Sequence, residues 1–211
     1  MARPMSAARE LLAGHPVVPV IVLDDAAHAP ELVAALAAGG IRCAEITLRT
    51  AAGLAAIASV ADTTDFVVGA GTVLSVADLD RCVDAGARFI VSPGFDDELV
   101  ARAAHHGVAV LPGVATATEV QRATRAGLDV VKFFPADRLG GLPTIAALAA
   151  PFVGMGFVPS GGVTAANAVE YLAHSAVPAV SGSWMATRDL INAGDFAAIE
   201  RLSREFIRAL A

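Results

Sequence analysis

Short, almost wholly apolar runs alternate with amphipathic stretches along most of the chain. One phrase recurs, in which a helix-like stretch ends in glycine and a β-rich run follows, as in ALAAGGIRCAEIT (35–47) and ATRAGLDVVKFFP (123–135). Runs without a polar face are typical of strands buried on both sides. We expect the glycines to take the left-handed conformation that ends a helix; they are Gly39, Gly86, Gly107 and Gly127.

The pattern predicts eight strands, separated by amphipathic helices such as APELVAALAAG and SVADLDRCVDAG. The predicted strands are residues 17–23, 41–47, 66–70, 88–92, 108–112, 129–134, 153–159 and 177–181. Eight strand–helix units are the number that builds a TIM barrel. We therefore predict an α/β fold with a single (β/α)8 barrel domain over residues 1–211 and a short N-terminal helix before the first strand. A doubly wound open sheet is the alternative, but it usually has fewer strands, and its dinucleotide fingerprint is missing.

Composition restricts the partners. The formal net charge is −6, and no basic block is present, so nucleic acid is not an expected partner. The strongest apolar run, VVPVIVL (17–23), is too short to span a bilayer, and we expect a soluble, cytoplasmic protein without a membrane partner. Cys43 and Cys82 are expected to be reduced, buried thiols. No cluster of histidines and carboxylates has metal-ligand spacing.

Lys132 is the only lysine of the chain, beside fourteen arginines, and it stands in the apolar run VVKFF. Because side chains alternate along a strand, Lys132 shares a face with Val130 and Phe134, and an inward direction would take it to the active-site mouth of a barrel. Burial there disfavours the charged ammonium, and a neutral amine can attack a carbonyl to form a Schiff base. Arginine stays protonated and cannot do so. The alternatives are a structural salt bridge or a misplaced strand end.

Two charged side chains, Glu45 and Arg49, lie at the end of the second predicted strand, in EITLR (45–49). Glu45, Thr47 and Arg49 alternate and are therefore expected on the same side. The apolar setting of Glu45 suits a general acid–base, and the planar guanidinium of Arg49 can bind a carboxylate through two hydrogen bonds. The alternatives are an ion pair of Glu45 with Arg42 or Arg49, and a solvated surface arginine.

Two glycine-containing turns, PSGG (159–162) and SGS (181–183), follow the last two predicted strands. Backbone N–H groups near a helix N-terminus bind anions, and glycine lets a ligand approach closely. These two loops are the usual phosphate position in a (β/α)8 barrel. Together they indicate a phosphorylated substrate, although glycine also serves in ordinary turns.

Seven motifs in this order resemble the family of bacterial 2-keto-3-deoxy-6-phosphogluconate (KDPG) aldolase, the KDPG/KHG aldolases. They are EITLRT, VGAGTVL, IVSPG, LPGVAT, VKFFPA, PSGGV and SGSWM, and the resemblance runs from about residue 10 to the C-terminus. It implies a lyase of the Entner–Doudoroff pathway, a class I aldolase that is usually a homotrimer. Such an enzyme cleaves KDPG to pyruvate and glyceraldehyde 3-phosphate through a covalent lysine Schiff base, with no metal or other cofactor.

The resemblance also implies a role for each matching residue. Lys132 would form the Schiff base, and Glu45 would be the acid–base residue. The other matching residues would be Arg49, Thr72 and Pro93 in the pyruvate pocket, Ser160, Gly161, Gly162, Gly182 and Ser183 at the phosphate, and Phe134 in the pocket wall. The chain departs from the family at two places. It has Ser160 where the family often has threonine and Ser181 where the family often has glycine, but the hydroxyls at 160 and 183 are kept.

Several alternative activities stay open. Related aldolases prefer 4-hydroxy-2-oxoglutarate (KHG) or the galactonate epimer of KDPG. Galactonate-type relatives often carry an arginine in the first strand, where this chain has VPVIVL, so that activity is disfavoured. A phosphosugar isomerase barrel, or a non-catalytic phosphosugar-binding barrel, would keep the glycine loops but form no covalent adduct.

Overall fold

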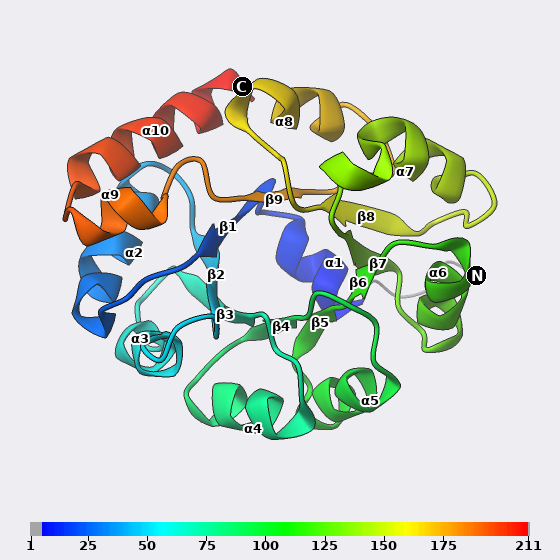
Figure 1. Cartoon of the computed structure of the whole chain (residues 1–211), viewed down its shortest axis with the longest axis horizontal. Helices are drawn as coiled ribbons and strands as arrows, with labels where there is room; N and C mark the ends of the chain where they lie inside the picture. The colour runs from blue at the N-terminus through cyan, green and yellow to red at the C-terminus, as the bar shows by residue number, and fades with distance from the viewer. Residues whose placement is uncertain (1–5, 211) are drawn as a thin grey trace.

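Parallel strands form a ring that is surrounded by helices (Figure 1). The structure is a computed structural model that describes residues 6–210. The strands described in that range are β1 (Val17–Ile21), β2 (Cys43–Thr47), β3 (Val67–Gly71), β4 (Phe89–Val91), β5 (Ala109–Leu111), β6 (Gly113–Val114), β7 (Val130–Phe133), β8 (Gly156–Pro159) and β9 (Val180–Gly182). Their order confirms the predicted (β/α)8 barrel.

The ring consists of two hydrogen-bonded sheets, with strand orders β5-β4-β3-β2-β1-β9 and β6-β7-β8. β5 lies within the predicted fifth strand (108–112), and β6 continues it beyond Pro112, past the predicted end. A Cβ at Gly113 would lie 2.0 Å from the Pro93 carbonyl oxygen, so glycine is required where the chain passes the turn after β4. On the other side, a parallel bridge between Ser160 and Ser181 continues β8 toward β9.

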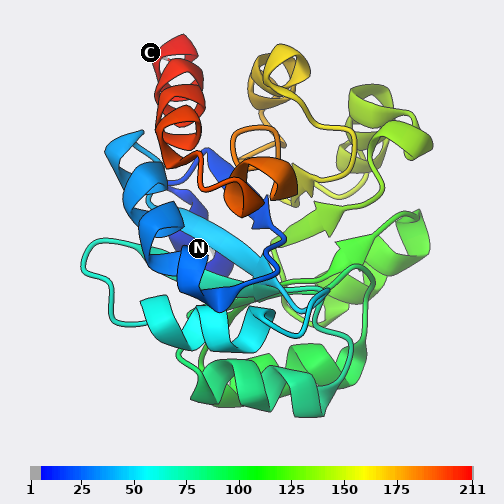
Figure 2. The same cartoon turned by 60° about the vertical axis from the view of Figure 1, so that its left-hand side comes forward.

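Helices surround the ring on its outside, except the first, which lies across one end of the barrel. They are α1 (Ala7–Leu12), α2 (Ala29–Ala38), α3 (Gly53–Val60), α4 (Val76–Asp84), α5 (Asp97–His106), α6 (Ala117–Arg125), α7 (Gly141–Ala149), α8 (Ala165–Leu172), α9 (Arg188–Asn192) and α10 (Phe196–Ala209), with 3-10 turns η1 (Ala26–His28) and η2 (Asp137–Leu139). The last helix, α10, lies beside α2 (Figure 2), so the end of the chain packs against the helix that follows the first strand.

The prediction that a left-handed glycine ends the helix is confirmed at three of the four positions. Gly86, Gly107 and Gly127 have φ values of 94°, 69° and 86°. Gly39 is a wrong prediction, since its φ is −77° and the next residue, Gly40, takes the left-handed conformation at 93°. Gly39 is needed for space instead, because a Cβ there would lie 2.4 Å from Cβ of Ser203 on α10.

Side chains alternate between two hydrophobic layers, as the strand geometry predicts. Val130 belongs to the cluster inside the barrel, whereas Val131 and Phe133 pack in the layer between strands and helices. Cys43 lies in the inner cluster, and its thiol has a pKa raised to about 12, mainly because burial disfavours the thiolate. Cys43 and Cys82 are both buried and unbridged, as predicted.

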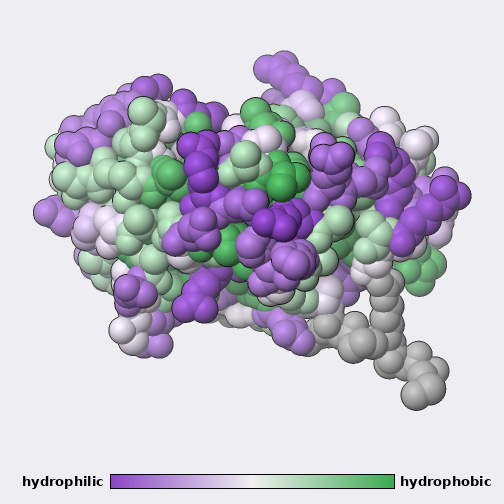
Figure 3. Space-filling model, turned by 90° about the horizontal axis from the view of Figure 1, so that it is seen from below, coloured by the Kyte–Doolittle hydropathy of each residue, from purple (hydrophilic) through white to green (hydrophobic). Residues whose placement is uncertain are grey.

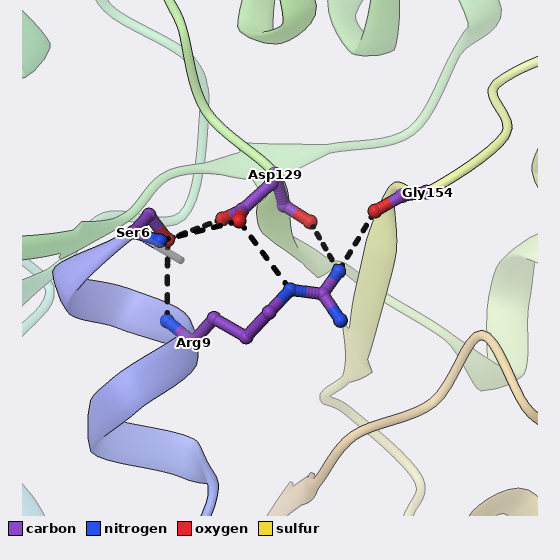
Figure 4. Close-up of polar contacts among 4 residues, drawn as sticks. All are labelled: Ser6, Arg9, Asp129 and Gly154. Atoms are coloured by element: carbon purple, nitrogen blue, oxygen red, sulfur yellow. Dashed lines mark hydrogen bonds and ion pairs between the residues drawn. The ribbon is translucent and has the colours of Figure 1, made fainter. Parts of the chain in front are cut away.

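Helix α1 closes the end of the barrel at which the strands begin (Figure 1), and Figure 4 shows the contacts of its first turn with Asp129. Its side chains Ala8 and Leu12 join the inner cluster. Asp129, directly before β7, accepts hydrogen bonds from the N–H and hydroxyl of Ser6 and lies 3.3 Å from Arg9 Nε. Arg9 Nη2 also donates to the carbonyls of Asp129 and Gly154, at 3.1 and 2.7 Å. The predicted domain range also includes residues 1–5 and 211, which lie outside the described residues.

Hydrophilic side chains are spread over the barrel side that α4 and α5 cover (Figure 3). Arg102 makes two hydrogen bonds to Asp80, at 2.7 and 3.0 Å, and His106 Nε2 lies 2.7 Å from the same carboxylate. These contacts join the two helices on their outer faces. Within residues 6–210, no helix has the length and apolarity needed to cross a membrane.

Candidate active site

A cavity of about 290 Å³ opens at the end of the barrel where the strands finish. Every candidate residue named from the sequence lines it. The lining consists of Val20, Glu45, Arg49, Thr72, Pro93, Lys132, Phe134, Ser160, Gly161, Gly162, Val163, Gly182 and Ser183. Sequence reasoning missed Val20 and Val163, which are apolar and carry no chemical signal. Strand alternation could have found Val20, which lies opposite Glu45 in the β1–β2 register.

Lys132 and Glu45 meet across the barrel in the wall of this cavity. Nζ of Lys132 lies 3.3 Å from Oε1 of Glu45, and the two residues are only 8% and 1% exposed. The other carboxylate oxygen, Oε2, is buried and has no hydrogen-bond partner among the described residues. A buried polar atom without a partner is costly, so Oε2 is placed to bind a substrate group or a water that moves protons.

The second strand holds Glu45 in place through its neighbours. All five residues of β2 are buried, and Thr47 satisfies its hydroxyl by donating to the Ile21 carbonyl at 2.8 Å. Gly71 on β3 leaves room for the carboxylate, since a Cβ there would lie 3.2 Å from Glu45 Cδ. The sequence alternative of a Glu45–Arg42 pair is wrong, because Arg42 lies 4.0 Å from Asp65 instead.

The residues expected around pyruvate lie beside this pair. Arg49 is exposed at the cavity mouth and has no carboxylate partner within residues 6–210, so its guanidinium is available for an anion. Thr72 has a φ of 58°, a left-handed conformation that is strained for a β-branched residue by about 1–3 kcal/mol. Strain of this kind is concentrated at functional sites.

The opposite end of the cavity is built from backbone. Gly161 and Gly162 have φ values of 89° and 73°, which explains why glycine is used at both positions. A Cβ at Gly182 would lie 2.3 Å from the Trp184 ring. Lys132 and Arg49 are the only cationic side chains in the described lining, so an anion bound at this end would be held by neutral N–H and hydroxyl donors.

The aromatic wall is Phe134, whose ring centre lies 5.5 Å from Lys132 Nζ. An ammonium at that distance is attracted by the ring quadrupole.

The described residues contain no group of three or more His, Cys, Asp or Glu side chains that could hold a metal ion. Glu45 is the only carboxylate in the described lining.

A buried lysine in contact with a buried carboxylate, at the mouth of a (β/α)8 barrel, is the arrangement of an aldolase that binds keto acids as a Schiff base. Comparison with known protein families also identifies an aldolase and narrows the class to one family. The family model of the KDPG and KHG aldolases matches residues 9–202. The chain belongs to the KDPG and KHG aldolase family.

Relatives cover almost the whole chain. The 2-dehydro-3-deoxy-phosphogluconate aldolase of Treponema pallidum is 46% identical and covers 91% of this chain and 92% of its own length. A KDPG aldolase structure from Legionella pneumophila, with pyruvate captured as a covalent carbinolamine, superposes with a TM-score of 0.91 at 36% identity, covering 94% of this chain and 97% of the other. The Zymomonas mobilis enzyme with 3-phosphoglycerate gives 0.88 at 38% identity and covers 96% of each chain.

Proposed function

We propose that this protein is a class I aldolase that cleaves KDPG to pyruvate and glyceraldehyde 3-phosphate. The observation that carries the proposal is the 3.3 Å contact between Lys132 Nζ and Glu45 Oε1 inside the cavity. The relatives support both halves of the substrate. The Legionella enzyme is described with covalently bound pyruvate and the Zymomonas enzyme with 3-phosphoglycerate, a phosphorylated three-carbon compound.

The proposed reaction begins with attack of the neutral Lys132 amine on the C2 ketone. Glu45 moves protons between nitrogen and oxygen, and its free Oε2 is the atom that can reach a water or the substrate. Loss of water from the carbinolamine gives a protonated imine. This cation accepts the electron pair of the C3–C4 bond when the C4 hydroxyl gives its proton to Glu45. The imine therefore supplies the electron sink, and the scheme needs no metal ion.

Bond cleavage leaves glyceraldehyde 3-phosphate and the enamine of pyruvate on Lys132. Protonation of the enamine at C3 restores the imine, and hydrolysis frees pyruvate and the lysine amine. Arg49 holds the substrate carboxylate through its guanidinium, with Thr72 and Pro93 beside it. Binding energy from the remote phosphate, held by Ser160, Gly161, Gly162, Gly182 and Ser183, fixes the C3–C4 bond near Lys132.

Borohydride trapping tests the covalent step. The protein is incubated with pyruvate, reduced and analysed by intact mass and peptide mapping. The chain contains one lysine, so only the α-amino group competes. We expect one reduced pyruvyl adduct on the peptide that contains Lys132. An unmodified Lys132 in the folded protein would contradict the Schiff-base scheme and favour an isomerase or a binding protein.

The neutral donors at the phosphate end favour a second substrate, 4-hydroxy-2-oxoglutarate. It shares the pyruvate half of KDPG, and its distal carboxylate can accept hydrogen bonds from the same N–H and hydroxyl groups. We expect slower cleavage of this compound than of KDPG. The galactonate epimer is a weaker candidate, because the first-strand side chain in the cavity is Val20 rather than arginine.

We further propose that the protein is a cytoplasmic homotrimer of the Entner–Doudoroff pathway, on the basis of its family membership. Light scattering coupled to gel filtration tests the trimer, with an expected mass of about three times the 21.3 kDa of one chain. A monomer at assay concentrations would contradict this proposal and leave the aldolase chemistry unaffected.

A further inference from the structure

The loop Ser160–Gly161–Gly162 is held from outside the cavity through its carbonyl groups. The Ala136 N–H donates to the Ser160 carbonyl at 2.8 Å, and the Asp137 N–H donates to the Gly161 carbonyl at 3.2 Å. Asn167 Nδ2 donates to the Gly162 carbonyl at 3.0 Å. The first two donors are backbone groups, which any residue would supply, so Asn167 is the only side chain among the three.

The direction of each carbonyl fixes the direction of the next N–H group. In a trans peptide unit, C=O and N–H point to opposite sides. Asn167 lies outside the cavity lining, whereas Gly162 and Val163 are part of it. The Asn167 bond therefore turns the Gly162 carbonyl away from the cavity and the Val163 N–H toward it. Among the described residues, the N–H groups of Gly162 and Val163 have no hydrogen-bond acceptor.

The corresponding position of another helix shows that Asn167 does more than cap α8. At both helices, a side chain three residues after the N-cap accepts the N-cap N–H. Glu119 accepts from the Thr116 N–H at 2.9 Å at α6, and Asn167 Oδ1 accepts from the Thr164 N–H at 2.8 Å at α8. A carboxylate is sufficient for this capping bond. Only an amide can also donate, and the donor of Asn167 is used on the Gly162 carbonyl.

We propose that Asn167 is a positioning residue that orients the Val163 N–H as a hydrogen-bond donor to the phosphate monoester of the substrate. This inference rests on the proposed function, because it assigns the phosphate to this end of the cavity. Two glycines with positive φ precede Val163, and such a sequence has wide conformational freedom unless other groups fix it. Loss of the Asn167 donor lets the Gly162–Val163 peptide turn, and the phosphate then loses a preorganised donor.

The test compares Asn167→Ala and Asn167→Asp with the wild-type protein. Asn167→Asp keeps the acceptor for the Thr164 N–H and loses the donor, whereas Asn167→Ala loses both without adding charge. We expect each variant to raise the KM for KDPG by about tenfold, as loss of one hydrogen bond to a charged group does. Half-saturation by pyruvate in borohydride trapping should change by less than about twofold, and inorganic phosphate should inhibit KDPG cleavage more weakly in both variants.

Glu119→Ala is the matched control, since it removes the same capping bond from α6 and touches nothing in the cavity lining. It should lower the melting temperature and leave the KM for KDPG unchanged. An unchanged KM in the Asn167 variants, or an equal loss for KDPG and pyruvate, would overturn the inference. Failure of the wild-type protein to cleave KDPG or to trap pyruvate would instead contradict the proposed function.

Discussion

The two ends of the barrel use polar groups in opposite ways. At the closed end, the Asp129 carboxylate contacts Ser6 and Arg9, and Arg9 also binds two carbonyls. At the open end, Glu45 leaves Oε2 without a partner among the described residues, and Thr72 keeps a strained φ of 58°. Satisfied groups stabilise the fold, whereas unsatisfied and strained groups cost stability and are kept where a ligand can use them.

The largest expected effect is at the open end. Lys132→Arg keeps the positive charge beside Glu45 but removes the only side-chain amine that can become an imine. We expect KDPG cleavage to fall by roughly a thousandfold or more and the pyruvyl adduct to disappear. Arg9→Lys, the reverse exchange at the closed end, is the control. It should leave turnover within about twofold of the wild type. Normal cleavage by Lys132→Arg would disprove the proposed mechanism.

Glu45→Gln should lower kcat by about a hundredfold, within the range expected for losing a general acid–base. The amide keeps the shape of the side chain but cannot take a proton. Single-turnover trapping should show slower adduct formation at saturating pyruvate. Glu119→Gln, on α6, is the control for the same chemical change. If Glu45→Gln trapped pyruvate and cleaved KDPG at wild-type rates, Glu45 would have only a structural role.

Asp129→Ala should show the reverse pattern at the closed end. Its removal leaves Ser6 and Arg9 without the carboxylate that anchors α1, and we expect a loss of about 1–3 kcal/mol in the free energy of unfolding. Turnover per folded molecule should stay within about twofold of the wild type. Urea unfolding and active-site titration by pyruvate trapping measure the two quantities separately. A large loss of kcat in the folded variant would mean that the two ends are coupled.

Thr72→Gly should separate stability from activity. Glycine adopts a φ of 58° without a side-chain penalty, so we expect the free energy of unfolding to rise by up to about 1 kcal/mol. Loss of the side chain from the cavity should raise the half-saturating pyruvate concentration in trapping. A variant that is less stable than the wild type would show that Thr72 contributes packing that outweighs the strain.

The smallest effect concerns a structural ion pair at the rim of the open end. Arg188 and Asn192 donate to Asp24, and these bonds lower the pKa of the Asp24 carboxyl from 3.8 to about 2. A carboxyl with a lowered pKa in the folded state stabilises the protein above its ordinary pKa, and this stabilisation is lost as pH falls from about 4 to about 2. Asp24→Asn should therefore be slightly less stable than the wild type at pH 6, and the difference should shrink by pH 2.5. A difference independent of pH would contradict this assignment.

The sequence predicted the barrel and the cavity because both leave regular signals. Apolar runs ending in glycine marked the strand–helix units, and a single lysine inside such a run marked the cavity. Other features depend on contacts between distant segments. The role of Gly39 is set by Ser203 on α10, and no local pattern contains that information. Val163 and Asn167 were missed because the relevant chemistry belongs to a backbone N–H and to the orientation of one peptide unit.

The closure of one barrel end by α1 has a kinetic consequence for the proposed reaction. In the proposed reaction, substrate and both products pass through the open end of the barrel, and pyruvate stays covalently attached to Lys132 until the imine is hydrolysed. The aldehyde therefore leaves first and pyruvate second, an ordered release. Pyruvate should inhibit competitively against KDPG, because it binds the free enzyme, and glyceraldehyde 3-phosphate should inhibit noncompetitively. In the synthetic direction, the enzyme must be charged with pyruvate before an aldehyde can react.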